Sequence, residues 1–374
     1  MPDSSVKGWD RSFLEAIGLG DLRAEQIGTE VGNMGEACGE GLTASAAAEL
    51  GLSQGTSVGV GIIDAHAGGL GVLGARLPSK DGSEAEEVNL ESRLALIAGT
   101  SCCHMASSKE PVFVPGVWGP YYSAMIPGLF LNEGGQSTAG KLLDHITTTH
   151  HAASDLEAQA SAQGLSRYEF LNEYILVLAK NEKIPPRKAG LLAKNLHVLP
   201  DFFGNRSPLA DPFMRGAVVG LSLSATLDDL ALLYLATVQS LAYQTKHILD
   251  AMTEAGHPPI NTIFVTGGLS KNPLYLETHA DATGCTLVLP REEDAVLLGS
   301  AVLGARAGLA FPDIPAAMAA MNAVGEMVPP FQLDGDDGAA DRSLPCLHEC
   351  KYAVFRRMND DQLWYRETMG QVEV

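Results

Sequence analysis

The segment "NTIFVTGGLSKNPLYLETHADATGCTLVLP", residues 261–290, alternates between strand and helix patterns. Its opening "NTIFVTGG" is a short β-branched run that ends in two glycines, and its close, "CTLVLP", is a second apolar run, so both predict strands. The "NPLYLETHADATG" between them predicts a helix. Helical spacing also predicts a long helix between Thr226 and Gly256 and a small-residue helix over 295–309. The order α-β-α-β-α indicates an α/β fold, in which helices pack against a sheet.

The preceding half of the chain shows the same alternation. "RLALIAGTSCCHMASS", residues 93–108, predicts two short strands that meet at a turn over 99–101. "TASAAAELGL", residues 43–52, predicts a capped helix that ends at Gly51. "TSVGVGIID", residues 56–64, predicts a buried strand that runs into a glycine-rich turn.

Length and charge restrict the function. The chain has 374 residues, enough for two domains, and its 45 acidic and 25 basic residues give a net charge of −20. Such a surface repels nucleic acid and anionic lipid, and no apolar run is long enough to span a membrane. The 6 cysteines are sparse and the first ten residues lack a signal-peptide core, so we expect a cytoplasmic protein.

Asp64 is the first candidate for chemistry. The predicted strand before it would deliver its carboxylate to the edge of a sheet, and the small residues after it leave room for a ligand. Asp64 could act as a general base, or it could simply cap the next helix. A metal site formed with His66 is disfavoured because the chain has no G-D-x-x-D and offers Arg206 where another ligand would stand. We therefore assign no metal-binding residue.

Three glycine motifs point to a nucleotide. "AGTS" at 98–101 lets a phosphate approach main-chain N–H groups, and "TGGLSKN" at 266–272 lies at a strand-to-helix junction. "EGGQSTAGK" at 133–141 is the third. Each alone is more often an ordinary tight turn. The three together with a carboxylate at a strand end favour nucleotide binding, although no Walker P-loop is present.

At this point the chain resembles the FGGY family of carbohydrate kinases, and within it the ribulokinase-like branch. The resemblance extends from about Gly8 to Gly308. It rests on six motifs in unchanged order: "IIDAHAGG" around Asp64, "GTSCCH" at 99–104, "VPGVWGP" at 114–120, "NEGGQS" at 132–137, "FGNRSPLADPFMRG" at 203–216 and "VTGGLSKNPLYLETHAD" at 265–281.

The resemblance implies an actin-like, ribonuclease-H-type ATPase fold in which ATP and sugar meet in a cleft between two domains. Family members open with a D-x-G-T-x-S-like phosphate hairpin that this chain lacks, so the N-terminal half-domain is expected to be missing. The expected division is the end of the first domain at 1–80, a hinge at 81–93, the complete second domain at 94–330 and a C-terminal extension with a terminal helix at 331–374.

Site residues are carried over from the same motifs. Asp64 resembles the family's catalytic base and lies against the substrate, and Glu133 resembles a carboxylate that binds sugar hydroxyls. The residues expected to bind ATP are Gly99 and Thr100 at the phosphates, Gly267, Gly268 and Asn272 at the adenosine, and Gly135 and Gln136 nearby. Mg²⁺ is the expected companion of ATP. His66 is expected to be structural, and Asn205 and Arg206 to bond to the backbone as a scaffold.

The function implied is ATP-dependent phosphorylation of a pentulose such as ribulose, or of a related polyol. The alternative is a non-catalytic fragment that binds nucleotide or a partner without turnover, a reading favoured by the absent first hairpin. The expected partner is a small sugar, with neither nucleic acid nor membrane, and an assembly of identical chains is left open.

Overall fold

The computed structural model describes residues 9–28, 31–78, 88–331 and 341–372. By internal contacts the chain divides into two compact units, the first formed by residues 1–62 and 300–317 and the second by 63–299 and 318–374. The second unit contains most of the predicted second domain. Residues 81–87 of the predicted hinge lie outside the described residues, and the rest of the hinge forms a short 3₁₀ turn and the first residue of a strand.

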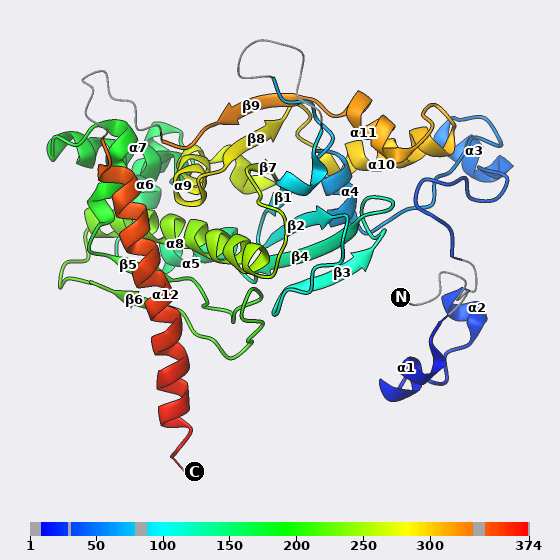
Figure 1. Cartoon of the computed structure of the whole chain (residues 1–374). Coiled ribbons are helices and arrows are strands. Elements are labelled where there is room, and N and C mark those ends of the chain that lie inside the picture. The colour runs from blue at the N-terminus through cyan, green and yellow to red at the C-terminus, as the bar shows by residue number, and fades with distance from the viewer. Residues whose placement is uncertain (1–8, 29–30, 79–87, 332–340, 373–374) are drawn as a thin grey trace. The chain divides into compact units, whose positions relative to one another are not determined.

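A seven-stranded sheet forms the centre of the second unit, in the order β3-β4-β2-β1-β7-β8-β9 (Figure 1). Its strands are β1 (Arg93–Ala98), β2 (Cys102–Ser108), β3 (Trp118–Tyr122), β4 (Phe130–Gln136), β7 (Thr262–Thr266), β8 (Thr286–Pro290) and β9 (Val324–Val328). Strands β1, β7 and β8 run parallel, and antiparallel strands extend the sheet on both sides of them. The predicted strands over 93–108 and 261–290 are confirmed, whereas β3, β4 and β9 were not predicted.

One face of the sheet packs against the long helix α8 (Leu227–Glu254), as the buried cluster that joins Leu94, Leu96 and Ile263 to Leu241 shows. Every second residue of β1 faces this cluster, as period-two geometry requires. The predicted helix between Thr226 and Gly256 is confirmed.

Segment 63–75 lies against the other face. Arg93 of β1 donates from Nη1 to the carbonyl oxygens of Leu73 (2.6 Å) and Ala75 (2.7 Å), and its guanidinium lies 5.2 Å from the ring centre of Phe264. The helix α4 (Asp64–Leu70) therefore lies beside β1 (Figure 1).

The second unit also contains further helices and a second sheet. They are α5 (Gly140–Thr149), α6 (Ala153–Gln163), α7 (Arg167–Asn181), the 3₁₀ helices η1 (Leu90–Ser92), η2 (Pro186–Ala193) and η3 (Gly268–Lys271), α9 (Pro273–Thr283), the two-stranded sheet of β5 (His197–Leu199) and β6 (Ala217–Val219), and α12 (Ser343–Met369). Two further helices, α10 (Ala295–Ala307) and α11 (Ile314–Met321), cross the boundary between the units.

The first unit contains α1 (Arg11–Ala16), α2 (Ala24–Ile27) and α3 (Ala44–Leu50). The predicted helix at α3 is confirmed, with Thr43 accepting from the Ala46 N–H and Gly51 left-handed at its end. The predicted strand over 56–64 is wrong. In the described chain this run forms only an isolated bridge to Ala37, and most of its side chains are exposed or half-buried, so no neighbouring ladder fixes it as a strand.

Candidate functional site

The turn between β1 and β2 is fastened to the start of α5. The carbonyl of Gly99 accepts from the Gly140 N–H (3.0 Å), and that of Thr100 accepts from the N–H groups of Ala139 (2.9 Å) and Lys141 (3.2 Å). A Cβ on Gly140 would fall 2.8 Å from the Gly99 carbonyl oxygen, so this close approach requires glycine. The first amides of α5 are thus satisfied by the turn, which holds the predicted phosphate hairpin in place.

A cavity of about 940 Å³ opens beside this turn. It brings together four predicted ATP-binding residues, Gly99, Thr100, Gly268 and Asn272. The rest of its lining is Gly140, Lys141, Asp144, Ser166, Tyr168, Glu169, Asn172, Leu269 and Lys271. Two lysines and exposed main chain give it the donors that phosphate oxygens need.

A second cavity of about 650 Å³ shares Gly268 and Lys271 with the first and adds Gly267. Gly267 has φ +93°, and a Cβ there would fall 2.5 Å from the Ala98 carbonyl oxygen. Gly268 differs, since a Cβ there would meet nothing within 4 Å. A side chain at Gly268 would therefore occupy open space in the cavities rather than strain the fold.

Asn272 is buried and holds the wall of the larger cavity. Its Oδ1 accepts from Asn172 Nδ2 (2.9 Å) and from the Tyr275 N–H (3.3 Å), and its Nδ2 donates to the Tyr234 hydroxyl (2.7 Å). The Tyr234 hydroxyl donates in turn to Asn172 Oδ1 (3.1 Å). The Asn272 side chain is thus committed to positioning α9 and α7 around the cavity.

Glu133, on β4, lies between the side chains of Arg206 and His66. Its Oε1 accepts from Arg206 Nη2 (2.6 Å), and its Oε2 lies 3.2 Å from His66 Nε2. The other ring nitrogen of His66 lies 3.1 Å from the Ala124 carbonyl oxygen. Both partners of His66 are acceptors, so only a ring with both N–H groups makes both bonds. The His66 hydrogen bond and the nearby Arg206 charge lower the pKa of Glu133.

Arg206 completes this charged cluster. Its guanidinium carbon lies 4.7 Å from the ring centre of Trp118, whose side chain is exposed, and its Nη1 donates to Cys103 Sγ (3.4 Å). A Cβ on Gly135 would fall 2.7 Å from Arg206 Nε, so the glycine makes room for the guanidinium. We refer to His66, Glu133, Arg206 and Trp118 as the Glu133 cluster.

The loop that carries Arg206 is anchored beneath it. Asp201 is 1% exposed and accepts from Asn205 Nδ2 (3.1 Å) and Gln244 Nε2 (2.8 Å). Burial raises the pKa of Asp201 to about 6. The expected backbone scaffold is therefore only partly correct. Asn205 pairs with its loop, but Arg206 bonds to the Glu133 side chain, since a half-buried carboxylate requires a cation.

Asp64 is the exposed first residue of α4, and its Oδ1 accepts from the Ala65 N–H (2.7 Å). The N-cap residue of α4 is Ile63, which makes no side-chain cap bond. Asp64 therefore leaves most of its carboxylate free, at the start of the short helix that also presents His66 to Glu133.

Gly135 and Gln136 lie in β4 and are not among the described residues that line the larger cavity. Gln136 is fully buried and donates from Nε2 to the Leu241 carbonyl (2.7 Å). Their contact with nucleotide stays a prediction.

Within the described ranges, no three His, Cys, Asp or Glu side chains gather as metal ligands, so we assign Mg²⁺ no residue. None of the helices in the described ranges combines the length and the apolar character that crossing a membrane requires.

The sequence predicts a backbone scaffold for Arg206, a structural role for His66 and no role for Trp118; it does not predict that these side chains gather around Glu133. The available signal was chemical: Glu133 stands in a run of apolar and glycine residues that forms an interior strand. A carboxylate in such a place needs a charged partner, and that requirement predicts that one of the arginines must reach it.

Comparisons with known proteins agree with the fold. Residues 94–308 match the C-terminal domain of the FGGY family of carbohydrate kinases. The chain is 50% identical over 368 residues to the FGGY carbohydrate kinase domain-containing protein of Xenopus laevis, covering 98% of this chain and 64% of that protein. It is 41% identical over 321 residues to the D-ribulokinase of Saccharomyces cerevisiae, covering 82% of this chain and 44% of that protein.

Two solved structures show the same architecture. The ligand-bound xylulose kinase from Lactobacillus acidophilus aligns with a TM-score of 0.68 at 15% identity, covering 97% of this chain and 61% of that one. The Plasmodium falciparum glycerol kinase with ADP aligns with a TM-score of 0.61 at 13% identity, covering 95% and 60%. The fold is the actin-like ATPase fold, as predicted.

The chain belongs to the FGGY family of carbohydrate kinases, which confirms the resemblance. It spans 64% of the length of its Xenopus laevis relative.

Proposed function

We propose that this chain binds ATP in the larger cavity and a sugar at the Glu133 cluster, and that the kinase it forms phosphorylates a pentulose such as ribulose, or a related polyol. The observation that carries the proposal is that Gly99, Thr100, Gly268 and Asn272, far apart in sequence, line one cavity. Family membership and the relatives named ribulokinase support the substrate class.

In the proposed reaction, Asp64 accepts the proton of a sugar hydroxyl while that oxygen attacks the γ-phosphorus of ATP. A P–O bond to the sugar forms, the bond to the β-phosphate oxygen breaks and ADP leaves. The exposed carboxylate of Asp64 supports this role because its one local hydrogen bond leaves acceptor capacity for the sugar. Glu133, fixed by His66 and Arg206, accepts hydrogen bonds from other hydroxyls.

On the nucleotide side, the Thr100 N–H and hydroxyl face phosphate oxygens together with the Lys141 ammonium. Thr100 is exposed at the tip of the turn that α5 holds in place. Gly268 admits the adenosine because it lines both cavities and carries no side chain, and Gly267 lines the smaller cavity beside it. The domain division given above, a cytoplasmic location and any assembly of identical chains belong to the same proposal.

Nucleotide binding is tested by calorimetry with ADP on Gly268→Val and on Gly304→Val. Neither glycine has a positive φ, and a Cβ at either would meet nothing within 4 Å, so both variants should fold. We expect Gly268→Val to weaken ADP binding by at least about tenfold because its side chain fills the cavity, and Gly304→Val to bind as the parent does. Equal affinity in both variants would place the nucleotide elsewhere.

Catalysis is tested separately, by sugar-dependent ADP release with ribulose and xylulose. Release that depends on the sugar supports the kinase. ADP binding without any sugar-dependent release, in the presence of Mg²⁺, would favour the alternative of a nucleotide-binding protein without turnover.

A further inference from the structure

The loop that carries Arg206 is closed by a pair of backbone hydrogen bonds. The Asn205 N–H donates to the Asp211 carbonyl and the Asp211 N–H donates to the Asn205 carbonyl, both at 2.9 Å. Asn205 Oδ1 also accepts from the Leu209 N–H (3.0 Å). Arg206 therefore projects from a small closed loop, and whatever fixes Asp211 also fixes the start of Arg206.

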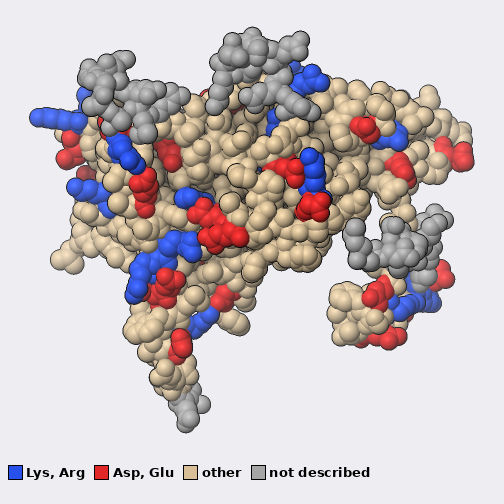
Figure 2. Space-filling model, in the orientation of Figure 1, with Lys and Arg blue, Asp and Glu red and all other residues tan. Residues whose placement is uncertain are grey.

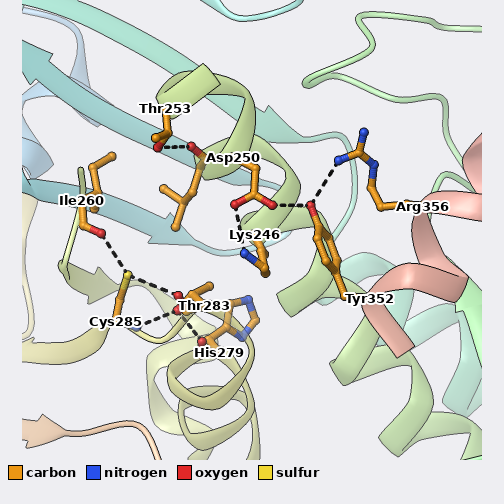
Figure 3. A network of polar contacts seen from close by, with 10 residues as sticks. Lys246, Asp250, Thr253, Ile260, His279, Thr283, Cys285, Tyr352 and Arg356 are labelled. Carbon is orange, nitrogen blue, oxygen red and sulfur yellow. Dashed lines mark hydrogen bonds and ion pairs between the residues drawn. The ribbon is translucent and has the colours of Figure 1, made fainter. Parts of the chain in front are cut away.

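The C-terminal helix α12 is firmly seated along most of its length. Tyr352 donates from its hydroxyl to Asp250 Oδ2 (2.6 Å), and Asp250 Oδ1 accepts from Lys246 Nζ (2.9 Å), so α12 is tied to α8 (Figure 3). Lys351 is 4% exposed and donates to the carbonyls of Ala193 (2.6 Å) and Leu196 (2.8 Å) and to a glutamine oxygen.

The same helix packs on the loop. Phe355 and Met358 of α12 lie in one buried cluster with Met214, and the half-buried Leu209 packs against that cluster. About two turns further along α12 the contact with the loop is ionic: Arg366 Nη2 donates to Asp211 Oδ2 (2.5 Å). The hydrogen bond from Arg366 lowers the pKa of Asp211. Acidic and basic groups lie side by side where α12 projects (Figure 2).

We infer that α12 braces the sugar side of the site, with Arg366 and Asp211 as positioning residues that hold the loop so that Arg206 meets Glu133. Neither residue needs to touch substrate. The effect of this brace on sugar binding rests on the proposed function. The contact between α12 and the loop does not. Among the described residues that line the larger cavity, none belongs to α12 or to the loop, so we expect the brace to affect sugar binding and not nucleotide binding.

The test compares Arg366→Ala with Arg357→Ala in the full chain. Arg357 is the matched control, since it also lies on α12 in an ion pair, with Asp361 at 2.8 Å, but does not reach the loop. Amide hydrogen exchange over 203–213 should be about three- to tenfold faster in Arg366→Ala and unchanged in Arg357→Ala. Equal exchange in the two variants would overturn the brace.

Three further variants test whether Arg366 and Asp211 act as a pair. Asp211→Asn keeps the acceptor for the Phe213 N–H but loses the charge, so it should loosen the loop as Arg366→Ala does, and the double variant should add little. Additive effects would mean that the two residues act independently, against the proposal. Arg366→Lys should restore slow exchange in part.

The enzymatic readout is the KM for sugar, expected to rise about three- to tenfold in Arg366→Ala with the KM for ATP unchanged. Faster loop exchange without a change in sugar KM would refute the brace as a positioning device. Where no sugar turnover exists even in the parent chain, the proposed function fails, and exchange over 203–213 still decides whether α12 ties the loop.

Discussion

The larger cavity, in which we propose that nucleotide binds, and the Glu133 cluster are built from the same sheet in opposite ways. The cavity is bounded at its critical points by main chain, with Gly99 in a tight turn and Gly268 facing open space. The cluster consists of side chains, and Glu133, at 12% side-chain exposure, is already engaged by His66 and Arg206. The cavity leaves space for its ligand, whereas the cluster fixes its groups in advance.

The cavity and the cluster should therefore respond differently to substitution. A cavity made of backbone changes its affinity when a side chain is added to it, with little effect on the fold. A network of partly buried charges loses stability when any member is removed, because the others keep their desolvation cost. Substitutions in the cavity and in the cluster should therefore differ in their effects on ligand binding and on stability.

The largest effect is expected at Asp64, which begins the helix of His66 but is itself exposed. In a preparation with established sugar-dependent ADP release, Asp64→Asn should reduce turnover by about two to four orders of magnitude with little change in thermal stability, because an amide cannot accept the proton. The control is Asp313→Asn, which changes a helix-start aspartate that accepts from the Ala316 N–H. Equal turnover in both variants would mean that Asp64 is not the general base and acts only at the start of its helix.

The next effect concerns Asp201, beneath the cluster. The pKa of Asp201 is about 6 in the folded protein and 3.8 for an ordinary aspartate. Between these pH values the Asp201 carboxyl is ionised in the unfolded chain but still protonated in the folded one, so the folded protein loses stability as pH rises. Asp201→Asn does not titrate. From pH 4 to 7, unfolding in urea should show the variant gaining on the order of 3 kcal/mol relative to the parent. Parallel stability curves would contradict the buried, raised carboxyl.

Removal of the Glu133 charge should have a smaller effect on the free energy of unfolding. Glu133→Gln leaves Arg206 and His66 without their carboxylate, and we expect the free energy of unfolding to fall by about 1–3 kcal/mol. Glu277→Gln is the control, since Glu277 is 44% exposed and lies 3.7 Å from its arginine. A loss no greater than that of the control would place the cluster among ordinary surface ion pairs.

The smallest change in stability is expected on the cavity side. A Cβ at Gly99 would come no closer than 3.8 Å to another atom, so Gly99→Ala should change stability by less than about 0.5 kcal/mol while weakening ADP binding. Gly140→Ala should instead destabilise by about 1–3 kcal/mol, because its Cβ meets the Gly99 carbonyl oxygen at 2.8 Å. Urea titration and calorimetry separate the two variants. Similar stability losses would mean that the turn is as tightly packed as the start of α5.

Much of the cavity could be predicted from sequence because its determinants are local. A glycine pair after a β-branched strand and a turn between two apolar runs are each recognisable within a few residues, and both proved to line the cavities. The cluster was harder. Arg206 and Glu133 are 73 residues apart, and only the folded sheet brings them together.

Strand prediction failed where pairing, not propensity, decides. Glu133, Gly134 and Gly135 form part of β4 because β2 pairs with them in register, Cys103 opposite Gly135 and Met105 opposite Glu133. The run over 56–63 has better strand-forming residues, but it makes only an isolated bridge within the described chain. The local sequence indicates how readily a segment forms a strand, but not whether a second strand lies beside it to pair with.

The hydrogen-bonded triangle of Asn172, Tyr234 and Asn272 constrains how related sequences can diverge. Each side chain both gives and receives within the triangle, so replacing one member leaves the other two with unmet hydrogen bonds in a buried place. Single replacements should therefore be rare among relatives, and joint replacements comparatively common. An alignment of homologues should show these three positions covarying, because their side chains depend on one another to form the cavity wall.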